Sequence, residues 1–179
     1  MRRNKIRLEN APKDCIRTNS GLYINVFETT EEMLCIEDIA HALSHQCRFA
    51  GHLTRFYSVA QHSINCSRKT SNPENKLAAL LHDATEAYLL DIPTPIKAKL
   101  PEYKRLEHKL SKVIAKKFNF IYPYHDEIKE IDGKMLHIEW DNLVANDNPE
   151  FVCLSPSKAK KAFVKEYYSI VKELKSVLV

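Results

Sequence analysis

Glycine is scarce in this sequence. Only three of its 179 residues are glycine, at Gly21, Gly51 and Gly133. The chain therefore contains neither the G-x-G-x-x-G fingerprint of dinucleotide-binding folds nor the G-x-x-x-x-G-K-[ST] phosphate-binding loop. Any phosphate group would have to be held by side-chain cations and a metal ion.

Cysteine pairs are absent as well. The five cysteines are odd in number and include no C-x-x-C pair: Cys15, Cys35, Cys47, Cys66 and Cys153. This pattern argues against a disulfide framework and against a zinc ribbon. We expect reduced thiols, most of them buried.

Long apolar runs are missing too. No apolar stretch approaches the roughly 18 to 20 residues that a membrane span needs. The basic N-terminus, MRRNKIRLENAPKD, lacks the apolar segment of a secretory signal. We therefore expect a cytoplasmic protein with no membrane partner. The net charge of +4 is mild and does not establish nucleic-acid binding.

The sequence does have the composition of one globular domain. With 44% hydrophobic and 28% charged residues, the chain is long enough to bury one core and too short for two comfortable domains. We expect a single domain over residues 1–179.

Helical periodicity runs through most of the chain. Apolar residues at helical spacing predict helices at 36–44, 52–69, 76–90, 103–118, 127–143 and 157–178. Residues 20–27 alternate as a strand does, which indicates half of a short N-terminal β-hairpin. The segment 91–101 contains three prolines and is expected to be an irregular loop. These patterns predict an all-α fold: a compact helical bundle with its core over 35–145 and a C-terminal helix at 157–178.

A polar group stands beside the apolar stripe of the third predicted helix. Adjacent helical residues project about 100° apart, so His82 and Asp83 can reach one point, and Glu86 lies one turn further on. A solvated helix face would explain these three residues equally well. His62 on the preceding helix favours a metal site, because an antiparallel neighbour could deliver it to the same point. Two imidazoles and a carboxylate can bind a divalent ion and leave positions open for water and substrate.

Three runs of sequence resemble a known enzyme family. YSVAQHS, LLHDATEAYLLDIPTPIK and EIKEIDGKML are similar to the H…HD…D signature of HD-superfamily metal-dependent phosphohydrolases. The resemblance covers about residues 35 to 140. Among members of that superfamily, it is closest to bacterial and phage 5′-deoxynucleotidases and to dNTP (dATP) triphosphohydrolases. It implies an HD-domain helical bundle that forms a homo-oligomer.

The resemblance also implies a set of metal ligands. These would be His62, His82, Asp83 and Asp132, holding one or more divalent ions: Zn²⁺, Mn²⁺, Co²⁺ or Mg²⁺. Asp126 and Asp141 compete with Asp132 for the last position. Asp132 is preferred because IKEIDGKML resembles the family's final-aspartate helix and because Asp132 adjoins an apolar stripe.

Five further residues take their expected roles from the resemblance. Arg48 would contact phosphate, Phe49 would lie near the sugar or base, and Lys97 would reach a polyphosphate. Glu86 would lie next to the metal-bound water, and Asp91 would contact water, sugar or leaving group. The catalytic residues would thus be Glu86, Asp91 and Arg48. The plainer alternatives are a surface ion pair for Arg48, a core position for Phe49 and an ordinary surface lysine for Lys97.

The expected function is hydrolysis of phosphoester or phosphoanhydride bonds in a small-molecule nucleotide. Two outcomes fit one site: a monophosphate would release phosphate, and a triphosphate would release triphosphate. Lys97 and the IPTPIK loop favour the triphosphate, with dATP as the leading candidate. A nuclease or a signalling-nucleotide hydrolase is one alternative, although the compact chain does not favour nucleic acid as the partner. A non-catalytic nucleotide-binding module is another.

Three other features suggest sites without completing one. His41 and His45 stand at i and i+4, but nothing nearby completes an H-E-x-x-H motif. Cys47 has no identifiable base beside it. The lysine-rich last helix is expected to pack on its own domain.

Overall fold

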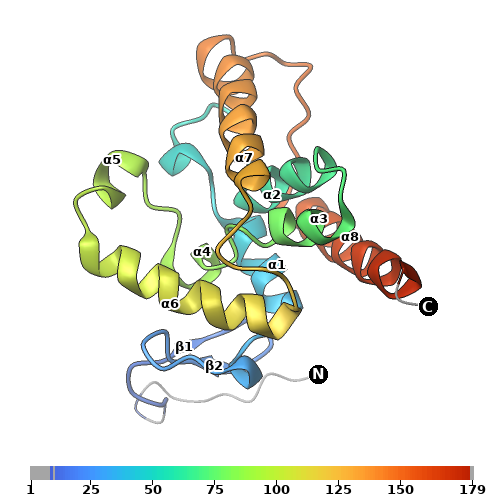
Figure 1. Cartoon of the computed structure of the whole chain (residues 1–179). Helices are drawn as coiled ribbons and strands as arrows, with labels where there is room; N and C mark the ends of the chain where they lie inside the picture. Colours follow the sequence, from blue (N-terminus) through green and yellow to red (C-terminus); the bar gives the residue numbers. More distant parts are fainter. Residues whose placement is uncertain (1–8, 10, 178–179) are drawn as a thin grey trace.

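The hairpin and the helices of this protein are seen in a computed structural model that describes residue 9 and residues 11–177 (Figure 1). In these residues β1 (Ile16–Arg17) pairs antiparallel with β2 (Tyr23–Ile24), with Ile16 opposite Ile24. All the remaining regular structure described is helical. The predicted all-α fold with a short N-terminal hairpin is confirmed. Residues 1–8 of the basic N-terminus and Leu178 of the predicted last helix lie outside the described residues.

The α-helices follow one another over the rest of the chain. Their bounds are α1 (Ile36–His45), α2 (Val59–Arg68), α3 (Pro73–Leu80), α4 (Glu86–Leu89), α5 (Thr94–Lys97), α6 (Pro101–Phe118), α7 (Asp126–Glu139) and α8 (Pro156–Val177). Two short 3-10 turns are η2 (Glu31–Met33) and η3 (Phe49–Gly51), and η4 (Trp140–Ala145) continues α7 as a π-helix.

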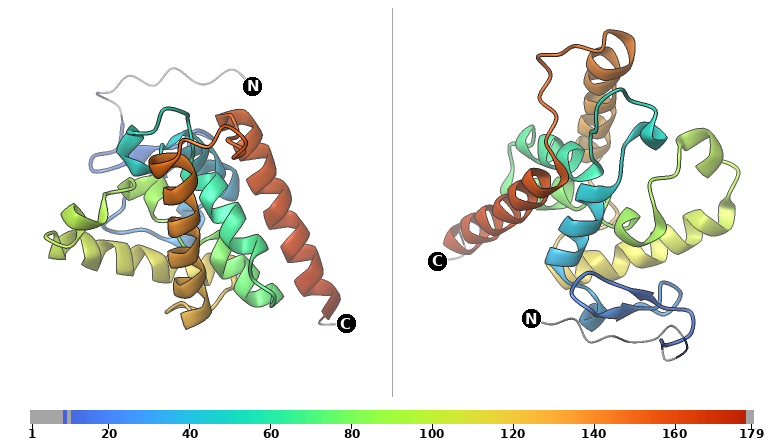
Figure 2. Two further views of the ribbon diagram at one scale, coloured as in Figure 1. Left: turned by 90° about the horizontal axis from the view of Figure 1, so that it is seen from above. Right: turned by 180° about the vertical axis from the view of Figure 1, so that it is seen from behind.

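The core forms where α1, α2, α3 and α8 pack together (Figure 2). α8 places Phe163 and Ile170 in this core, so the lysine-rich helix packs on its own domain as expected. α7 packs against α2 and α3 through a second apolar cluster that includes Ile128, Ile131 and Met135. This contact brings the middle of α7 beside the middle of α2. None of the described helices is long and apolar enough to cross a membrane.

Local signals explain several helix starts. Pro73 opens α3 after Asn72, whose side chain accepts a hydrogen bond from the Glu74 N–H. The Ser58 side chain caps α2 in the same way by accepting from the Gln61 N–H. α2 therefore begins at Val59, and the prediction that it starts near residue 52 is wrong.

The predicted helix over 76–90 is interrupted. α3 ends at Leu80, and the chain passes through a tight turn before α4 begins at Glu86. In this turn the N–H of Ala84 bonds to Leu81 O, and the N–H of Glu86 bonds to Asp83 O, both three residues back. The expected apolar positions are still buried because such a turn nearly preserves the helical spacing. His82 and Asp83 consequently lie in a turn and not on a helix face.

The proline-rich segment also differs from its prediction as an irregular loop. It contains the short helix α5, and Leu90 just before it has a φ of 69°. A positive φ strains a residue with a branched side chain, and such strain is concentrated at functional sites.

Candidate metal centre

Four side chains predicted as metal ligands meet beside α2. His62 comes from the middle of α2 and is fully buried, Asp132 comes from α7, and His82 and Asp83 come from the turn between α3 and α4. The packing of α7 on α2 and α3 brings these segments to one place.

The ligand atoms of these side chains are close together. Asp132 Oδ1 lies 3.0 Å from His62 Nε2 and 3.8 Å from His82 Nε2. Asp83 Oδ2 lies 3.7 Å from His62 Nε2 and 3.3 Å from His82 Nε2. Ligand atoms placed tetrahedrally at about 2.1 Å from a zinc ion would be about 3.4 Å apart. The spacing therefore fits the coordination shell of one divalent ion.

Hydrogen bonds hold the two imidazoles with Nε2 facing this point. Nδ1 of His82 donates to the Ala79 carbonyl at 2.7 Å, and Nδ1 of His62 lies 2.7 Å from Glu139 Oε1. Such partners fix the tautomer and ring orientation of metal-binding histidines. Nε2 of His82 is buried and has no hydrogen-bond partner among the described atoms. A buried nitrogen lone pair of this kind fits a bound cation, so the residues present suit a metal ion.

The charges at the centre attract positive charge. Burial alone would lower the pKa of His82, but the carboxylates of Asp83 and Asp132 outweigh it and raise that pKa to about 10. Burial would likewise raise the pKa of Asp132, whereas the hydrogen bond to His62 and the neighbouring charge of His82 hold it well below its usual range. Without a metal these histidines bind protons instead, and a divalent ion would displace those protons.

Two further residues at the centre were not identified from the sequence. Cys66 Sγ lies 3.4 Å from His62 Nε2, and ligand atoms of His62, Cys66, His82 and Asp132 all lie within 4.8 Å of one another. Cys66 follows His62 by four residues on α2. Glu139 follows Asp132 by seven residues on α7. Spacings of four and seven residues place Cys66 on the same helix face as His62, and Glu139 on the same face as Asp132. This shared face is the signal that the sequence offered for both residues.

Glu139 links His62 to Arg48. It is fully buried, its Oε1 accepts from the Tyr57 hydroxyl at 2.8 Å, and its Oε2 lies 3.0 Å from Arg48 Nε. Burial would lower the pKa of Arg48, but Glu139 and then Asp83 raise it. Arg48 is therefore a permanently charged guanidinium at the metal centre, with Nη1 3.9 Å from Asp83 Oδ2.

Glu86 and Asp91 form an acidic pair near Arg48. Burial, followed by the charges of Asp83 and Asp91, raises the pKa of Glu86 well above its ordinary value. Burial, partly opposed by Arg48, also raises the pKa of Asp91. Gln46 fixes the backbone that carries both, because its side chain donates to Glu86 O at 2.8 Å and accepts from the Asp91 N–H at 3.2 Å.

Lys97 is held by carboxylates. Its Nζ lies 2.7 Å from Glu107 Oε1 and 3.8 Å from Glu86 Oε1, and it stands over the ring of Tyr103. Burial would lower the pKa of Lys97, but the hydrogen bond to Glu107 raises it. Its charge is therefore retained and already paired.

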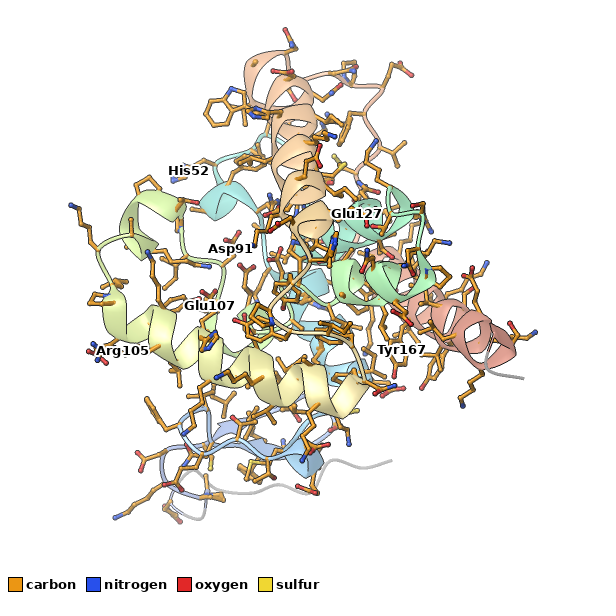
Figure 3. All side chains as sticks on the ribbon, viewed as in Figure 1. His52, Asp91, Arg105, Glu107, Glu127 and Tyr167 are labelled. Atoms are coloured by element: carbon orange, nitrogen blue, oxygen red, sulfur yellow. The ribbon has the colours of Figure 1, made fainter. Side chains whose placement is uncertain are left out.

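A large cleft opens onto the centre. It has a volume of about 970 Å³, and its lining includes all the predicted substrate-binding residues: Arg48, Phe49, Asp91 and Lys97. Figure 3 shows Asp91 in the space between the segment carrying His52 and α6, which carries Glu107. A second cleft of about 430 Å³ reaches His82, Asp83 and Asp132 from the side of α6. The larger cleft thus brings together two of the metal ligands, Asp83 and Asp132, with Arg48 and the acidic pair.

Several residues weighed as alternative ligands or as other sites lie outside the metal centre. Asp126 is exposed and pairs with Lys129, and Asp141 is exposed on η4, so neither joins the cluster. His45 Nδ1 bonds to the His41 carbonyl within α1. All five cysteines are free thiols, as expected, but only Cys66 is buried, so the expectation that most of them are buried is wrong. An isolated antiparallel bridge pairs the backbone of Cys47 with that of Ser58, the residue that caps α2.

Two known proteins have sequences similar to that of this chain. No family model matches the sequence. The uncharacterized protein YfdR of Escherichia coli strain K12 is 41% identical over 148 residues, which cover 83% of each chain. An uncharacterized protein of Rhodobacter capsulatus is 37% identical over 111 residues, or 57% of each chain. The identity and coverage of the first comparison show that this chain belongs to the same protein family as YfdR.

Proposed function

We propose that the chain is a metal-dependent phosphohydrolase of the HD superfamily that acts on 2′-deoxynucleotides. The observation that carries this proposal is the convergence of two imidazole nitrogens on two carboxylates, Asp83 and Asp132, which line the large cleft beside the charged Arg48. Clefts that combine a few convergent polar groups with perturbed pKa values are typical of active sites.

His62, His82, Asp83 and Asp132 would hold the metal. A divalent ion bound there supplies a water of lowered pKa and a Lewis acid for a phosphoryl oxygen. Zn²⁺, Mn²⁺, Co²⁺ and Mg²⁺ are all candidates, and the mixed nitrogen and oxygen donors favour the first three over Mg²⁺.

Arg48 and the acidic pair would act on the substrate directly. The guanidinium of Arg48 offers N–H donors to phosphate oxygens and neutralises charge that develops on them. Glu86 Oε2 is buried without a hydrogen-bond partner among the described atoms, so it is free to hold or pass on a proton. Glu86 and Asp91 together would take the proton of the attacking water and supply one to the leaving oxygen.

The pairing of Lys97 bears on the length of the phosphate chain. A triphosphate needs several cations, whereas Lys97 is already paired with the Glu107 carboxylate at 2.7 Å. This favours a monophosphate as substrate and phosphate as product. The volume of the cleft leaves room for a triphosphate, with dATP as the leading example, and that is the second candidate.

The test is a substrate panel. Purified protein loaded with Mn²⁺, Co²⁺, Zn²⁺ or Mg²⁺ is given dNMPs, dNTPs, NMPs, NTPs and a short oligonucleotide, and phosphate is resolved from triphosphate. We expect metal-dependent release from deoxynucleotides that a chelator abolishes. Inactivity on the whole panel, with metal bound, would favour a non-catalytic nucleotide-binding module. Cleavage of the oligonucleotide alone would favour a nuclease.

A further inference from the structure

The large cleft has an apolar wall as well as a charged floor. Trp140 and Leu136, both on the α7–η4 segment, line the cleft with 52% and 41% of their surfaces exposed. Val144 extends the same wall. Exposed apolar side chains gathered in one concave place mark a binding surface for an apolar group. The phosphate chemistry of the floor leaves this wall unexplained.

The wall lies at a defined distance from the metal ligands. Asp132, Leu136 and Trp140 follow at intervals of four residues, so they form one stripe along the helix. Eight residues of helix rise about 12 Å. A ligand whose charged end is at Asp132 would therefore present its other end to Trp140. A mononucleotide, with phosphate at one end and an aromatic base at the other, has this character.

The ring of Phe49 packs beside the indole of Trp140. The two ring centroids lie 6.2 Å apart at an angle of 59°, so no base can lie flat between them. The guanidinium of Arg48 lies 5.6 Å from the centroid of the Phe49 ring. Phe49 therefore contacts both Arg48 and Trp140. The exposed part of Trp140 remains for a planar ligand.

We propose that Trp140, backed by Phe49, is the platform on which the nucleobase stacks. This inference rests on the proposed function for the position of the phosphate. Leu136 and Val144, on the same helical segment as the indole, line the cleft with apolar side chains, and His52, His137 and Thr94 are polar members of the same lining. The contact assigned to the base is stacking on the indole. Purines should therefore bind more tightly than pyrimidines, because they offer the larger stacking area.

Intrinsic fluorescence tests the platform directly, because Trp140 is the single tryptophan of the sequence. The full-length protein is titrated in EDTA, where the proposed enzyme does not turn over, with dAMP, deoxyadenosine, dCMP and 2-deoxyribose 5-phosphate. Free N-acetyltryptophanamide corrects for absorption by the bases. We expect saturable quenching by dAMP and deoxyadenosine, weaker quenching by dCMP, and none by the sugar phosphate.

Variants extend the test to turnover. Loss of one stacking contact weakens binding by about 10- to 100-fold. Trp140→Ala should raise KM for dAMP by that factor with little change in kcat, and Trp140→Phe should restore most of the loss. The matched control is Ile121→Ala, an exposed apolar residue outside this cleft.

The two proposals fail in different ways. Hydrolysis of dAMP without quenching, or with an unchanged KM in Trp140→Ala, overturns the platform and leaves the proposed function standing. Base-dependent quenching without hydrolysis of any nucleotide supports the platform and contradicts the proposed function. Neither quenching nor hydrolysis overturns both.

Discussion

Nδ1 of His62 lies 2.7 Å from Oε1 of Glu139, and both side chains are fully buried. Burial would raise the pKa of Glu139. The hydrogen bond to His62, the charges of His62 and Arg48, and the hydrogen bond from Tyr57 outweigh burial and lower that pKa. Glu139 is therefore an ionised carboxylate that orients the imidazole and makes Nε2 more basic. Carboxylates in this position are part of many metal sites without touching the metal.

Glu139→Gln tests that relationship. The amide keeps the shape but removes the charge that orients His62, so we expect metal affinity to fall about 10- to 100-fold. A competition titration against a chromophoric chelator measures it. Glu130→Gln, an exposed change on the same helix, should leave the affinity unaltered. Equal affinities in wild type and Glu139→Gln would exclude this role.

Cys66 offers an alternative ligand set, since its thiol lies 3.4 Å from His62 Nε2, nearer than Asp83 Oδ2 at 3.7 Å, and Cys66 replaces Asp83 in the set of ligand atoms that all lie within 4.8 Å of one another. We assign Asp83 and not Cys66 as the ligand, because carboxylates suit a hydrolytic ion that must keep water bound. Cobalt-loaded protein should then lack a thiolate-to-cobalt charge-transfer band. Cys66→Ser should keep one metal per chain, and Asp83→Asn should lose it. A strong band that disappears in Cys66→Ser would assign the metal to the thiolate.

Arg48→Lys tests transition-state stabilisation. Lysine keeps the charge but loses the planar fork that binds a phosphate with two donors. We expect kcat/KM to fall by about 10²- to 10³-fold, as when one donor to a developing charge is removed. Arg68→Lys serves as control because Arg68 is exposed and pairs with Glu166 on α8. A change of less than threefold in Arg48→Lys would contradict the assigned role.

Gln46 is predicted to contribute to stability. Gln46→Met leaves the buried Glu86 carbonyl and the Asp91 N–H without their side-chain partner, so unfolding free energy should fall by about 1–3 kcal/mol. Chemical denaturation measures this, with exposed Lys69→Met as control. An unchanged free energy of unfolding would show that water replaces both bonds.

The helical fold could be predicted because most of its signals are local. Periodicity located the apolar residues of the long helices. The predicted start of α3 at residue 76 is late, because Asn72 caps the helix and Pro73 opens it. The break after Leu80 could not be seen, because a tight turn keeps Leu81 and Ala84 on the buried side. The late start of α2 depends on Ser58, whose capping bond competes with continued helix upstream.

The site was less predictable than the fold. His62, His82 and Asp83 were inferred partly from a helix geometry that the turn replaces, yet α2 and α7 still bring them together with Asp132. Glu139 was missed because its role depends on a tertiary contact with His62, which no local pattern encodes. The role proposed for the exposed Trp140 depends on its position in the large cleft, which no local sequence pattern predicts.

Metal content in a matched pair of variants tests the metal centre itself. Metal-loaded Asp132→Ala and Asp141→Ala, two changes in the α7–η4 segment, are desalted and their divalent metal per chain is measured by mass spectrometry together with dAMP and dATP turnover. We predict loss of the metal and of turnover in Asp132→Ala, with both retained in Asp141→Ala. Retention of metal in Asp132→Ala and its loss in Asp141→Ala would contradict the assignment of Asp132 as a ligand.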